Sequence, residues 1–318
     1  MPASQKSGEM IKLDDLRTKV EFNNSLISPA LERAGFKELA GKIRVCSQWS
    51  AFATCQSCGA RYFVGTSTHC DSRFCSVCSK RRALAWLAKM VPLLEDYRRR
   101  GYLVFFLNLT IKDGESLDES LALLARAWRY MVHDDRQSRK EFRALNNGGV
   151  RSVEVKIGAG SGMWHPHIHS IVIVKSDTAV RQFEDYRALW ERAARNAYGA
   201  PGKYGSVFIH GISDKAGGRG NLGLMRGVVE TFKYMCKFDW VDLPPERLNE
   251  LVTVTAGRHF ISSWGELYGL NKQVQALMDE NTEHDLKNEV CKVCGCTEFE
   301  LDNLLTKEAK APVLYFDN

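Results

Sequence analysis

The first half of the chain carries two clear hydrophobic patterns. Apolar residues spaced three or four positions apart share one face of a helix, and a short unbroken apolar run fits a buried strand. Residues 103–111 form such a run and predict a strand, while residues 28–40 predict a short helix. A longer helix before the strand is predicted by the spacing of Leu84, Leu87, Val91 and Leu94.

The second half continues with elements whose order defines the fold class. Residues 150–157 and 168–174 are predicted strands, and the glycine-containing turn 158–162 between them is typical of a hairpin. The remaining predicted elements are an amphipathic helix around 121–131, a helix over 180–197, a strand over 207–212 and a helix over 228–238. The pattern therefore predicts an α+β fold, in which helices pack on an antiparallel sheet.

The same pattern divides the chain into four segments. We expect an N-terminal lead-in over 1–45, a cysteine-rich module with a basic helix over 46–100, the sheet domain over 101–270 and a C-terminal tail over 271–318. A length of 318 residues with 44% apolar content is sufficient for packed cores. We find no internal repeat and no low-complexity tract.

Charge adds a candidate partner. The 44 basic and 38 acidic residues give a net charge of +6, a mild excess that suits a polyanionic partner without requiring one. Residues 71–100 are more biased, with eight basic and three acidic side chains beside a group of cysteines. We expect DNA contacts from Arg73, Arg81 and Arg82 there, and from Lys233 and Arg219 elsewhere, although a charged face is more often simply solvated.

The compartment follows from what the chain does not contain. Its first 15 residues are polar, and its longest aliphatic run, residues 171–174, is too short to cross a bilayer. We therefore expect a cytoplasmic protein with no membrane partner. Because a reducing cytoplasm disfavours disulfides, the ten cysteines favour metal binding.

Two Cys-x-x-Cys pairs match the ligand spacing of structural Zn²⁺ sites. Cys55 and Cys58 precede Cys75 and Cys78, with sixteen residues between the pairs. Cys70 leaves the ligand set open, because Cys70, Cys75 and Cys78 with one upstream cysteine make an equally good tetrad. A site made of four thiolates is closed to substrates, so this zinc would serve folding and DNA docking.

A second cysteine cluster lies near the C-terminus. Cys291, Cys294 and Cys296 lack an obvious fourth ligand in their own segment. The completing residue is expected to be either His284 or a cysteine from the first cluster, for which the spare Cys46 is a candidate. This cluster, too, predicts structural zinc.

Two histidines stand two residues apart at the start of an aliphatic strand. Alternation along a strand sends the imidazoles of His167 and His169 to the same face, where they supply half of a divalent-metal site and leave positions for phosphate and water. Glu154 on the neighbouring strand points opposite to its aliphatic neighbours and is the expected third ligand. His165 is interpreted as a bystander, because Pro166 is expected to break the alternation.

A later helix carries a glutamate and a tyrosine on one face. Glu230, Tyr234 and Lys237 are spaced four and three residues apart and lie on the same side of a predicted helix. A tyrosine oxygen has an ordinary pKa of about 10 and needs a nearby cation to act as a nucleophile, which Lys237 or Lys233 could supply. Glu230 is placed one turn away, as a general base would be.

Taken in order, these residues resemble the rolling-circle plasmid replication initiators of the HUH endonuclease superfamily, in the branch with one tyrosine and an assisting glutamate. Residues 106–110 (Phe-Leu-Asn-Leu-Thr) resemble the first strand of that family, residues 165–169 (His-Pro-His-Ile-His) its metal motif, and residues 230–234 (Glu-Thr-Phe-Lys-Tyr) with Lys237 its nucleophile motif. The order and spacing of the three motifs agree with the family.

The resemblance extends over about residues 45 to 270. Residues 70–82 are similar to the cysteine segment of the family, and residues 257–265 resemble its C-terminal portion. Asn108 stands where the family usually has threonine, and the C-terminal cysteine cluster has no place in the family pattern.

The resemblance implies a fold, an activity and a set of partners. The fold would be an HUH nuclease domain of the ferredoxin or RRM type. Tyr234 would attack a phosphate of single-stranded or hairpin origin DNA with Mg²⁺ or Mn²⁺ held by His167, His169 and Glu154. Glu230 would act in termination. A host helicase and a DNA polymerase would then extend the free 3′ end.

Two other readings of the sequence stay open. A single-strand transposase of the same superfamily would use the same chemistry in another biological setting. A zinc-ribbon protein that binds DNA without catalysis would use His167, His169 and Tyr234 only for packing. A conjugative relaxase is disfavoured, because relaxases normally have a three-histidine cluster and an N-terminal tyrosine.

Overall fold

The computed structural model describes most of the chain, and the described residues group into two compact units. The cysteine-rich unit is built from residues 1–88, 235–249 and 274–318, and the sheet unit from residues 89–234 and 250–273. The described residues are 12–66, 68–175, 182–212, 224–232, 237–280, 286, 289–309 and 313–315.

The sheet unit contains a five-stranded antiparallel sheet; the antiparallel sheet and four of its strands are predicted by the sequence pattern, whereas β7 is not. Its strand order is β6-β3-β5-β4-β7, so β5 lies at the centre and pairs with β3 on one side and β4 on the other. The strands are β3 (Tyr102–Ile111), β4 (Gly148–Ile157), β5 (Trp164–Lys175), β6 (Gly205–Ile212) and β7 (Ile261–Gly265). The predicted α+β class is confirmed.

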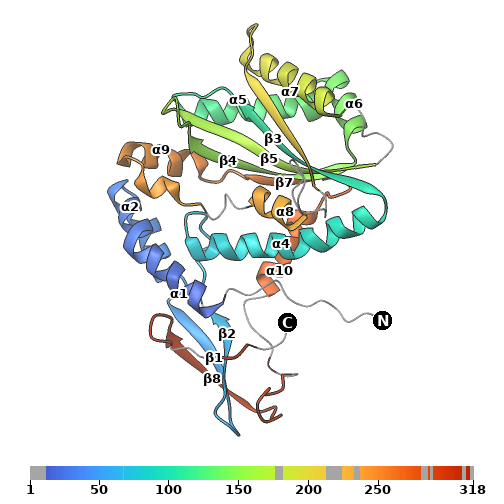
Figure 1. The fold of residues 1–318 in the computed structure, drawn as a ribbon. Coiled ribbons are helices and arrows are strands. Elements are labelled where there is room, and N and C mark those ends of the chain that lie inside the picture. Colours follow the sequence, from blue (N-terminus) through green and yellow to red (C-terminus); the bar gives the residue numbers. More distant parts are fainter. Residues whose placement is uncertain are drawn as a thin grey trace. The chain divides into compact units, whose positions relative to one another are not determined.

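Three helices cover one face of this sheet: α5 (Leu117–Arg129), α6 (Arg136–Leu145) and α7 (Gln182–Tyr198) (Figure 1). Side-chain oxygens of Ser116 and Asp135 accept hydrogen bonds from backbone N–H groups in the first turns of α5 and α6, which fixes where those helices begin. A π-helical turn (Tyr130–Asp134) joins them. The core between helices and sheet is formed by alternate strand residues, including Leu107, Leu109, Ile168, Val172 and Val207.

The opposite face of the sheet carries the residues between those core positions. Because side chains alternate along a strand, the burial of Leu107 and Leu109 under the helices turns Asn108 to this second face. Helix α8 (Leu224–Phe232) packs on this side against β4 and β5. The second face is therefore partly covered over its central strands.

The hairpin of β4 and β5 is confirmed, but β5 begins earlier than predicted. Backbone hydrogen bonds close the turn between Gly158 and Met163, and β5 starts at Trp164 rather than at residue 168. Pro166 does not interrupt the strand. It pairs with Val155 of β4. The pairing of β5 with β3 ends one residue later, at Thr110 and His167, so the missing N–H of Pro166 costs no hydrogen bond to β3.

The cysteine-rich unit begins with helices where a lead-in was expected. These are α1 (Leu13–Phe22), a π-helical turn (Asn23–Ile27), α2 (Ser28–Arg33) and α3 (Lys37–Val45). The single helix predicted over 28–40 is wrong, because the chain turns at Gly35, whose φ of +95° is readily adopted by glycine.

Strands close to both ends of the chain form the second sheet. Its order is β2-β1-β8, with β1 (Trp49–Cys55) in the centre, β2 (Arg61–Thr66) and β8 (Phe299–Leu305). Strand β8 runs antiparallel to β1 from the pair Trp49–Leu305 to the pair Cys55–Phe299. The segment expected as a C-terminal tail therefore completes the sheet of the cysteine-rich module.

The remaining elements are mostly helical. They are α4 (Ser76–Arg99), a 3₁₀ turn (Asp239–Asp242), α9 (Pro245–Thr255) and α10 (Leu270–Glu280). Helix α4 contains the predicted face of Leu84, Leu87, Val91 and Leu94. Among the helices that the structure describes, none is both long and apolar enough to span a membrane.

Gly149 provides a test of the sheet core. Its missing side chain leaves room for the Trp264 ring, and an alanine Cβ there would lie 2.5 Å from Trp264 Cζ2 and 2.4 Å from the Ile171 carbonyl oxygen. We expect Gly149→Ala to lower the free energy of unfolding by about 1–3 kcal/mol, the usual range for overpacking. Urea denaturation followed by circular dichroism measures this.

Gly160→Ala is the matched control, because no atom lies within 4 Å of the position of its added Cβ. It should leave stability unchanged or slightly raised, since alanine restricts the unfolded chain. Equal denaturation midpoints for the two variants would contradict the packing described for Gly149.

Candidate functional site

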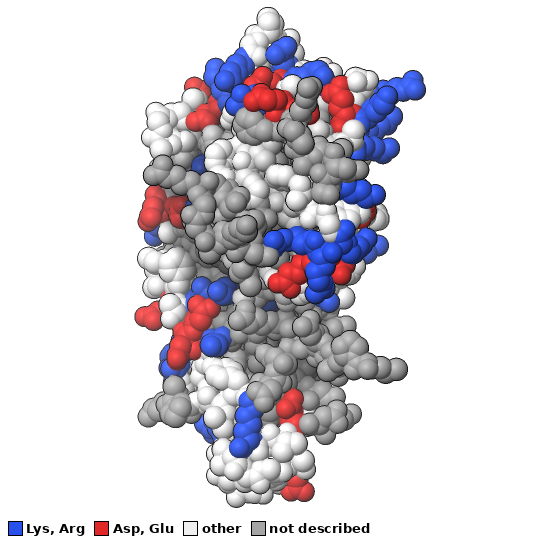
Figure 2. Space-filling view, turned by 45° about the vertical axis from the view of Figure 1, so that its right-hand side comes forward, with Lys and Arg blue, Asp and Glu red and all other residues white. Residues whose placement is uncertain are grey.

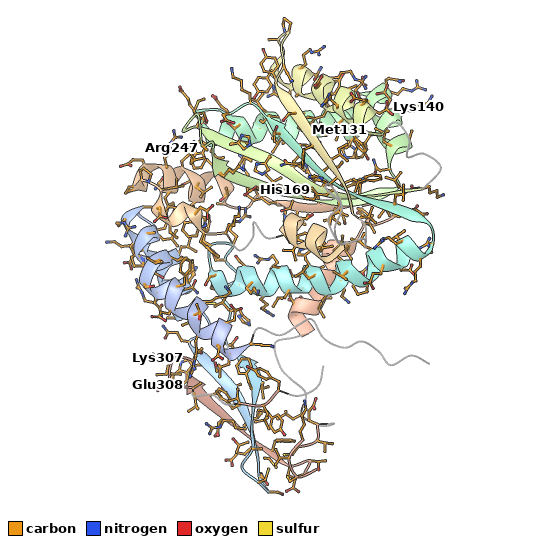
Figure 3. The ribbon with its side chains drawn as sticks, in the orientation of Figure 1. Met131, Lys140, His169, Arg247, Lys307 and Glu308 are labelled. Atoms are coloured by element: carbon orange, nitrogen blue, oxygen red, sulfur yellow. The ribbon has the colours of Figure 1, made fainter. Side chains whose placement is uncertain are left out.

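The register of β4 against β5 brings two histidines and a glutamate together. Glu154 lies directly opposite His167, and His169 follows two residues later on the same face. The Nε2 atoms of both histidines contact one carboxylate oxygen of Glu154, with His169 Nε2 at 2.9 Å. All three side chains are buried, and their ligand atoms lie within 4.8 Å of one another. Figure 3 shows His169 on β5 in the middle of the sheet.

The environment holds two of these groups in the protonation state that a metal requires. Burial opposes ionisation of Glu154, but hydrogen bonds from His167 and His169 outweigh it and lower the pKa of the carboxyl to about 2. Burial lowers the pKa of His169 to about 4, against the opposing effect of Glu154. At neutral pH the site therefore contains a carboxylate and a neutral His169 imidazole, both able to donate electron pairs.

The hydrogen bonds of His167 support a bound cation. Its Nδ1 lies 3.3 Å from the backbone oxygen of His165, which can only accept, so Nδ1 carries the proton. Nε2, the other ring nitrogen, faces the Glu154 carboxylate. A divalent metal bound by both groups would take the place of this direct contact, so the donor set fits such an ion.

Glu154, His167 and His169, which we call the triad, are surrounded by contacts that hold the histidine rings in place. Phe106 stacks on His169, with ring centroids 5.5 Å apart and planes inclined by 24°. Asp113, just after β3, contacts His165 Nδ1 and accepts a hydrogen bond from the Ser161 hydroxyl. Burial acts against ionisation of Asp113, but these two hydrogen bonds prevail and lower its pKa. His165, interpreted as a bystander, thus lies outside the triad but is held beside it.

The predicted nucleophile helix is only partly described. Tyr234, Lys233 and Arg219 lie outside the described residues, and so does the side chain of Glu230. The backbone of Glu230 belongs to α8, which packs against the two strands that carry the triad. Lys237 is exposed. The described part of the structure therefore brings the helix that carries Glu230 to the face that carries Glu154, His167 and His169.

The cysteines form two tetrads, which we call site A and site B. Site A consists of Cys46, Cys70, Cys75 and Cys78, and site B of Cys55, Cys58, Cys291 and Cys294. Sulfur atoms are 3.6 Å apart between Cys46 and Cys78, and 3.5 Å apart between Cys58 and Cys291. Four thiolates about 2.3 Å from a tetrahedral zinc would be about 3.8 Å apart, so both tetrads can hold a metal such as zinc.

This grouping corrects the simplest interpretation of the spacing. The structure does not bring Cys55 and Cys58 beside Cys75 and Cys78; it agrees instead with the alternative tetrad in which Cys46 is the upstream cysteine. The C-terminal cluster is completed by Cys55 and Cys58, not by Cys46, and His284 lies outside the described residues. Sequence reasoning left both groupings among its open alternatives, because each Cys-x-x-Cys pair fits several partners equally well.

Cys296 is not part of either tetrad. Its sulfur accepts a hydrogen bond from the backbone N–H of Glu298 at 3.3 Å. In contrast, the Tyr62 hydroxyl donates to Cys291 Sγ at 3.3 Å, and this bond lowers the pKa of the Cys291 thiol to about 6. Cys291 is therefore prepared to bind metal as a thiolate.

Two of the basic residues predicted to contact DNA, Arg81 and Arg82, make hydrogen bonds within the protein. Arg81 donates to the backbone oxygen of Met278, and Arg82 to that of Asp71. Burial lowers the pKa of Arg73. On the face shown in Figure 2, Lys and Arg side chains form several groups, with acidic side chains beside most of them. Charge alone therefore does not define a DNA path on that face.

Substitution of a ligand in site B should remove the zinc of site B and leave the zinc of site A. The wild-type protein is expected to hold two zinc ions per chain, and Cys291→Ser to hold one, because site A shares no ligand with site B. Atomic emission measurement of zinc per chain, after dialysis into metal-free buffer, checks this.

Cys296→Ser is the matched control and should retain two zinc ions, because Cys296 belongs to neither tetrad. Loss of an ion in Cys296→Ser, or its full retention in Cys291→Ser, would contradict the assignment of site B.

Comparison with known proteins connects this geometry to a family. The family model described as "Replication protein" (Rep_1) matches residues 61–299, about three quarters of the chain. A protein named "Protein rep" from Lactiplantibacillus plantarum is 25% identical over 229 residues, which cover 67% of this chain and 68% of that protein. A second "Protein rep", from Streptococcus pneumoniae, is 25% identical over 224 residues, or 66% and 64% of the two chains.

No solved structure matches this chain. The family assignment therefore stands on the sequence match, which spans both the cysteine-rich unit and the sheet unit. The matched range also contains the whole triad and Cys291 and Cys294 of site B. The chain belongs to the Rep_1 family of replication proteins, and this membership supports a role in initiating plasmid replication.

Proposed function

We propose that this protein starts rolling-circle replication of a plasmid by nicking one strand of origin DNA and joining itself to the new 5′ end. Family membership supports the role in replication, since Rep initiators are generally nicking enzymes. The observation that carries the proposed chemistry is the convergence of Glu154, His167 and His169 on one buried point of the sheet. The order of the three sequence motifs supports assignment to the HUH superfamily.

Glu154, His167 and His169 would bind Mg²⁺ or Mn²⁺. One carboxylate and two neutral imidazoles leave coordination positions open, unlike the closed thiolate tetrads of sites A and B. A divalent ion bound there would supply Lewis acidity, polarising the scissile phosphate and stabilising the charge that develops on its oxygens. The chain itself provides the geometry, because the β4–β5 register and the Phe106 ring hold the ligands in place.

Tyr234 would be the nucleophile. Its phenolic oxygen forms a bond to phosphorus while the bond from phosphorus to the 3′ oxygen breaks, which leaves a 5′-phosphotyrosine and a free 3′-hydroxyl. The phenolic proton is lost, and the departing 3′ oxygen gains one. Lys237 or Lys233 would favour the phenolate through its positive charge.

Glu230 would act after one round of replication. Four residues before Tyr234 in the sequence, it would remove a proton from water or from a new 3′-hydroxyl that attacks the phosphotyrosine. The tyrosine is then released as the leaving group. A single tyrosine suffices in this scheme because a carboxylate, not a second tyrosine, activates the terminating nucleophile.

The cysteine-rich unit would support docking of the origin. Zinc in sites A and B would fix its strands and helices, and the candidate phosphate contacts are Arg73, Arg81, Arg82, Arg219 and Lys233. A host helicase and DNA polymerase would extend the free 3′ end in the cytoplasm. Family membership favours replication over the transposase reading of the same chemistry.

Removal of the nucleophile should abolish the covalent product. Purified Tyr234→Phe, incubated with Mn²⁺ and a labelled single-stranded oligonucleotide spanning the plasmid origin, should form protein-linked DNA at least about a thousandfold more slowly than wild type. A denaturing gel separates free from protein-linked DNA.

Tyr268→Phe is the control, since Tyr268 is 83% exposed and lies outside the proposed site. It should form the adduct at the wild-type rate. A wild-type protein that binds origin DNA but never cleaves it, with any divalent ion, would replace the proposal with a non-catalytic zinc-dependent DNA binder.

Replacement of the proposed base should separate the two half-reactions. Glu230→Gln keeps the size of the side chain and removes its basicity, so initial nicking should stay within about threefold of wild type, while release from the adduct falls by about 10²–10⁴-fold. Isolated adduct, incubated with a second oligonucleotide that ends in a 3′-hydroxyl, measures the release. Equal loss of both steps would argue against a role confined to termination.

A further inference from the structure

The sheet face that carries the triad continues onto β3 and the edge strand β6. Asn108 pairs with His169 on one side and with Phe208 on the other, and Thr110 pairs with His167 and Ser206 in the same way. Directly opposed residues share a face, so Phe208 and Ser206 lie on the same side as the metal ligands. Val207, between them, faces the helix-covered core and confirms this orientation.

Phe208 is exposed on this face. Its side chain is 52% exposed, while the ring of His210 lies against its edge, with centroids 4.0 Å apart and planes nearly perpendicular. Helix α8 packs on β4 and β5, and α7, the helix with the main contact to β6, packs on the other face of the sheet. A single exposed apolar side chain is ordinary, but Phe208 lies on the same face as the triad, across β3 from His169.

The groups beside Phe208 are polar but uncharged. Asn108 Oδ1 is buried and has no hydrogen-bond partner among the described residues, although buried acceptors normally have one. The hydroxyls of Thr110 and Ser206 are hydrogen-bonded to each other at 2.6 Å. Strand β6 has no Lys, Arg, Asp or Glu, so this surface offers stacking and neutral hydrogen bonds rather than phosphate contacts.

We propose that Phe208 stacks on a nucleobase of the single-stranded DNA next to the scissile phosphate. This inference rests on the proposed nicking function and adds a positioning residue to it. Phe208 is two strands, or about 10 Å, from His169. At 3.4 Å or more per nucleotide, the stacked base is at most about three nucleotides from the scissile phosphate.

The test measures binding separately from cleavage. Fluorescence anisotropy with single-stranded origin oligonucleotides, performed in the Tyr234→Phe background, gives the Kd without strand breakage. Phe208→Ala should raise the Kd by about 5- to 150-fold, and Phe208→Trp should restore it, because stacking on an aromatic ring depends on ring area. Tyr268→Ala, an exposed aromatic beyond the opposite edge of the sheet, should leave the Kd unchanged.

An abasic scan distinguishes stacking from a general effect on the fold. A set of oligonucleotides carries one abasic position each, within three nucleotides of the cleavage site. The protein that retains Phe208 should bind one member of this set more weakly than the others. For Phe208→Ala, that oligonucleotide should bind no more weakly than the intact oligonucleotide does. An unchanged Kd in Phe208→Ala, or the same added loss at every abasic position, would overturn the proposal.

Adduct formation by wild-type protein with Mn²⁺ tests the nicking function independently. A wild type that forms the adduct while Phe208→Ala keeps the wild-type Kd refutes the stacking inference alone. A position-specific abasic effect without any adduct supports the stacking inference and refutes the nicking function.

Discussion

The antiparallel pairing of β5 with β3 and β4 is the constraint on which the proposed chemistry depends. It sets Glu154 opposite His167 and Asn108 opposite His169, so every candidate group on the second face takes its position from this register. A slip of one residue would turn His167 and His169 into the helix-covered core. The register is held on the other face by large apolar side chains such as Trp128, Trp190 and Trp264, which tolerate no such shift.

One face of the sheet forms the apolar core, and the other face carries the candidate functional residues. On the first face, α5, α6 and α7 bury an apolar core, and this burial allows the second face to carry groups that would not stabilise a core. The two imidazoles stabilise the buried Glu154 carboxylate, and a divalent ion would add to that stabilisation. The triad therefore fits the metal site proposed above better than it fits packing alone.

The cysteine tetrads connect distant parts of the chain. Site B joins Cys55 and Cys58 to Cys291 and Cys294, and β8 pairs with β1 in the same unit. Bringing such distant segments together costs conformational entropy, which grows slowly with the length of the loop and which metal binding can offset. Site A, whose ligands all lie between Cys46 and Cys78, closes a much shorter stretch. Zinc in site B would thus couple the C-terminal strand to the N-terminal module.

The sequence by itself determined the features that depend on local spacing. Alternation predicted the β4–β5 hairpin and sent His167 and His169 to one face, and the order of the motifs pointed to replication proteins. Only the tertiary structure decided which cysteines share a metal, that β8 completes the sheet of β1, and that Asp113 and Phe208 lie on the triad's side of the fold. Such contacts join residues far apart in the chain. Residue spacing constrains only neighbours, so these contacts depend on the register and packing of the whole molecule.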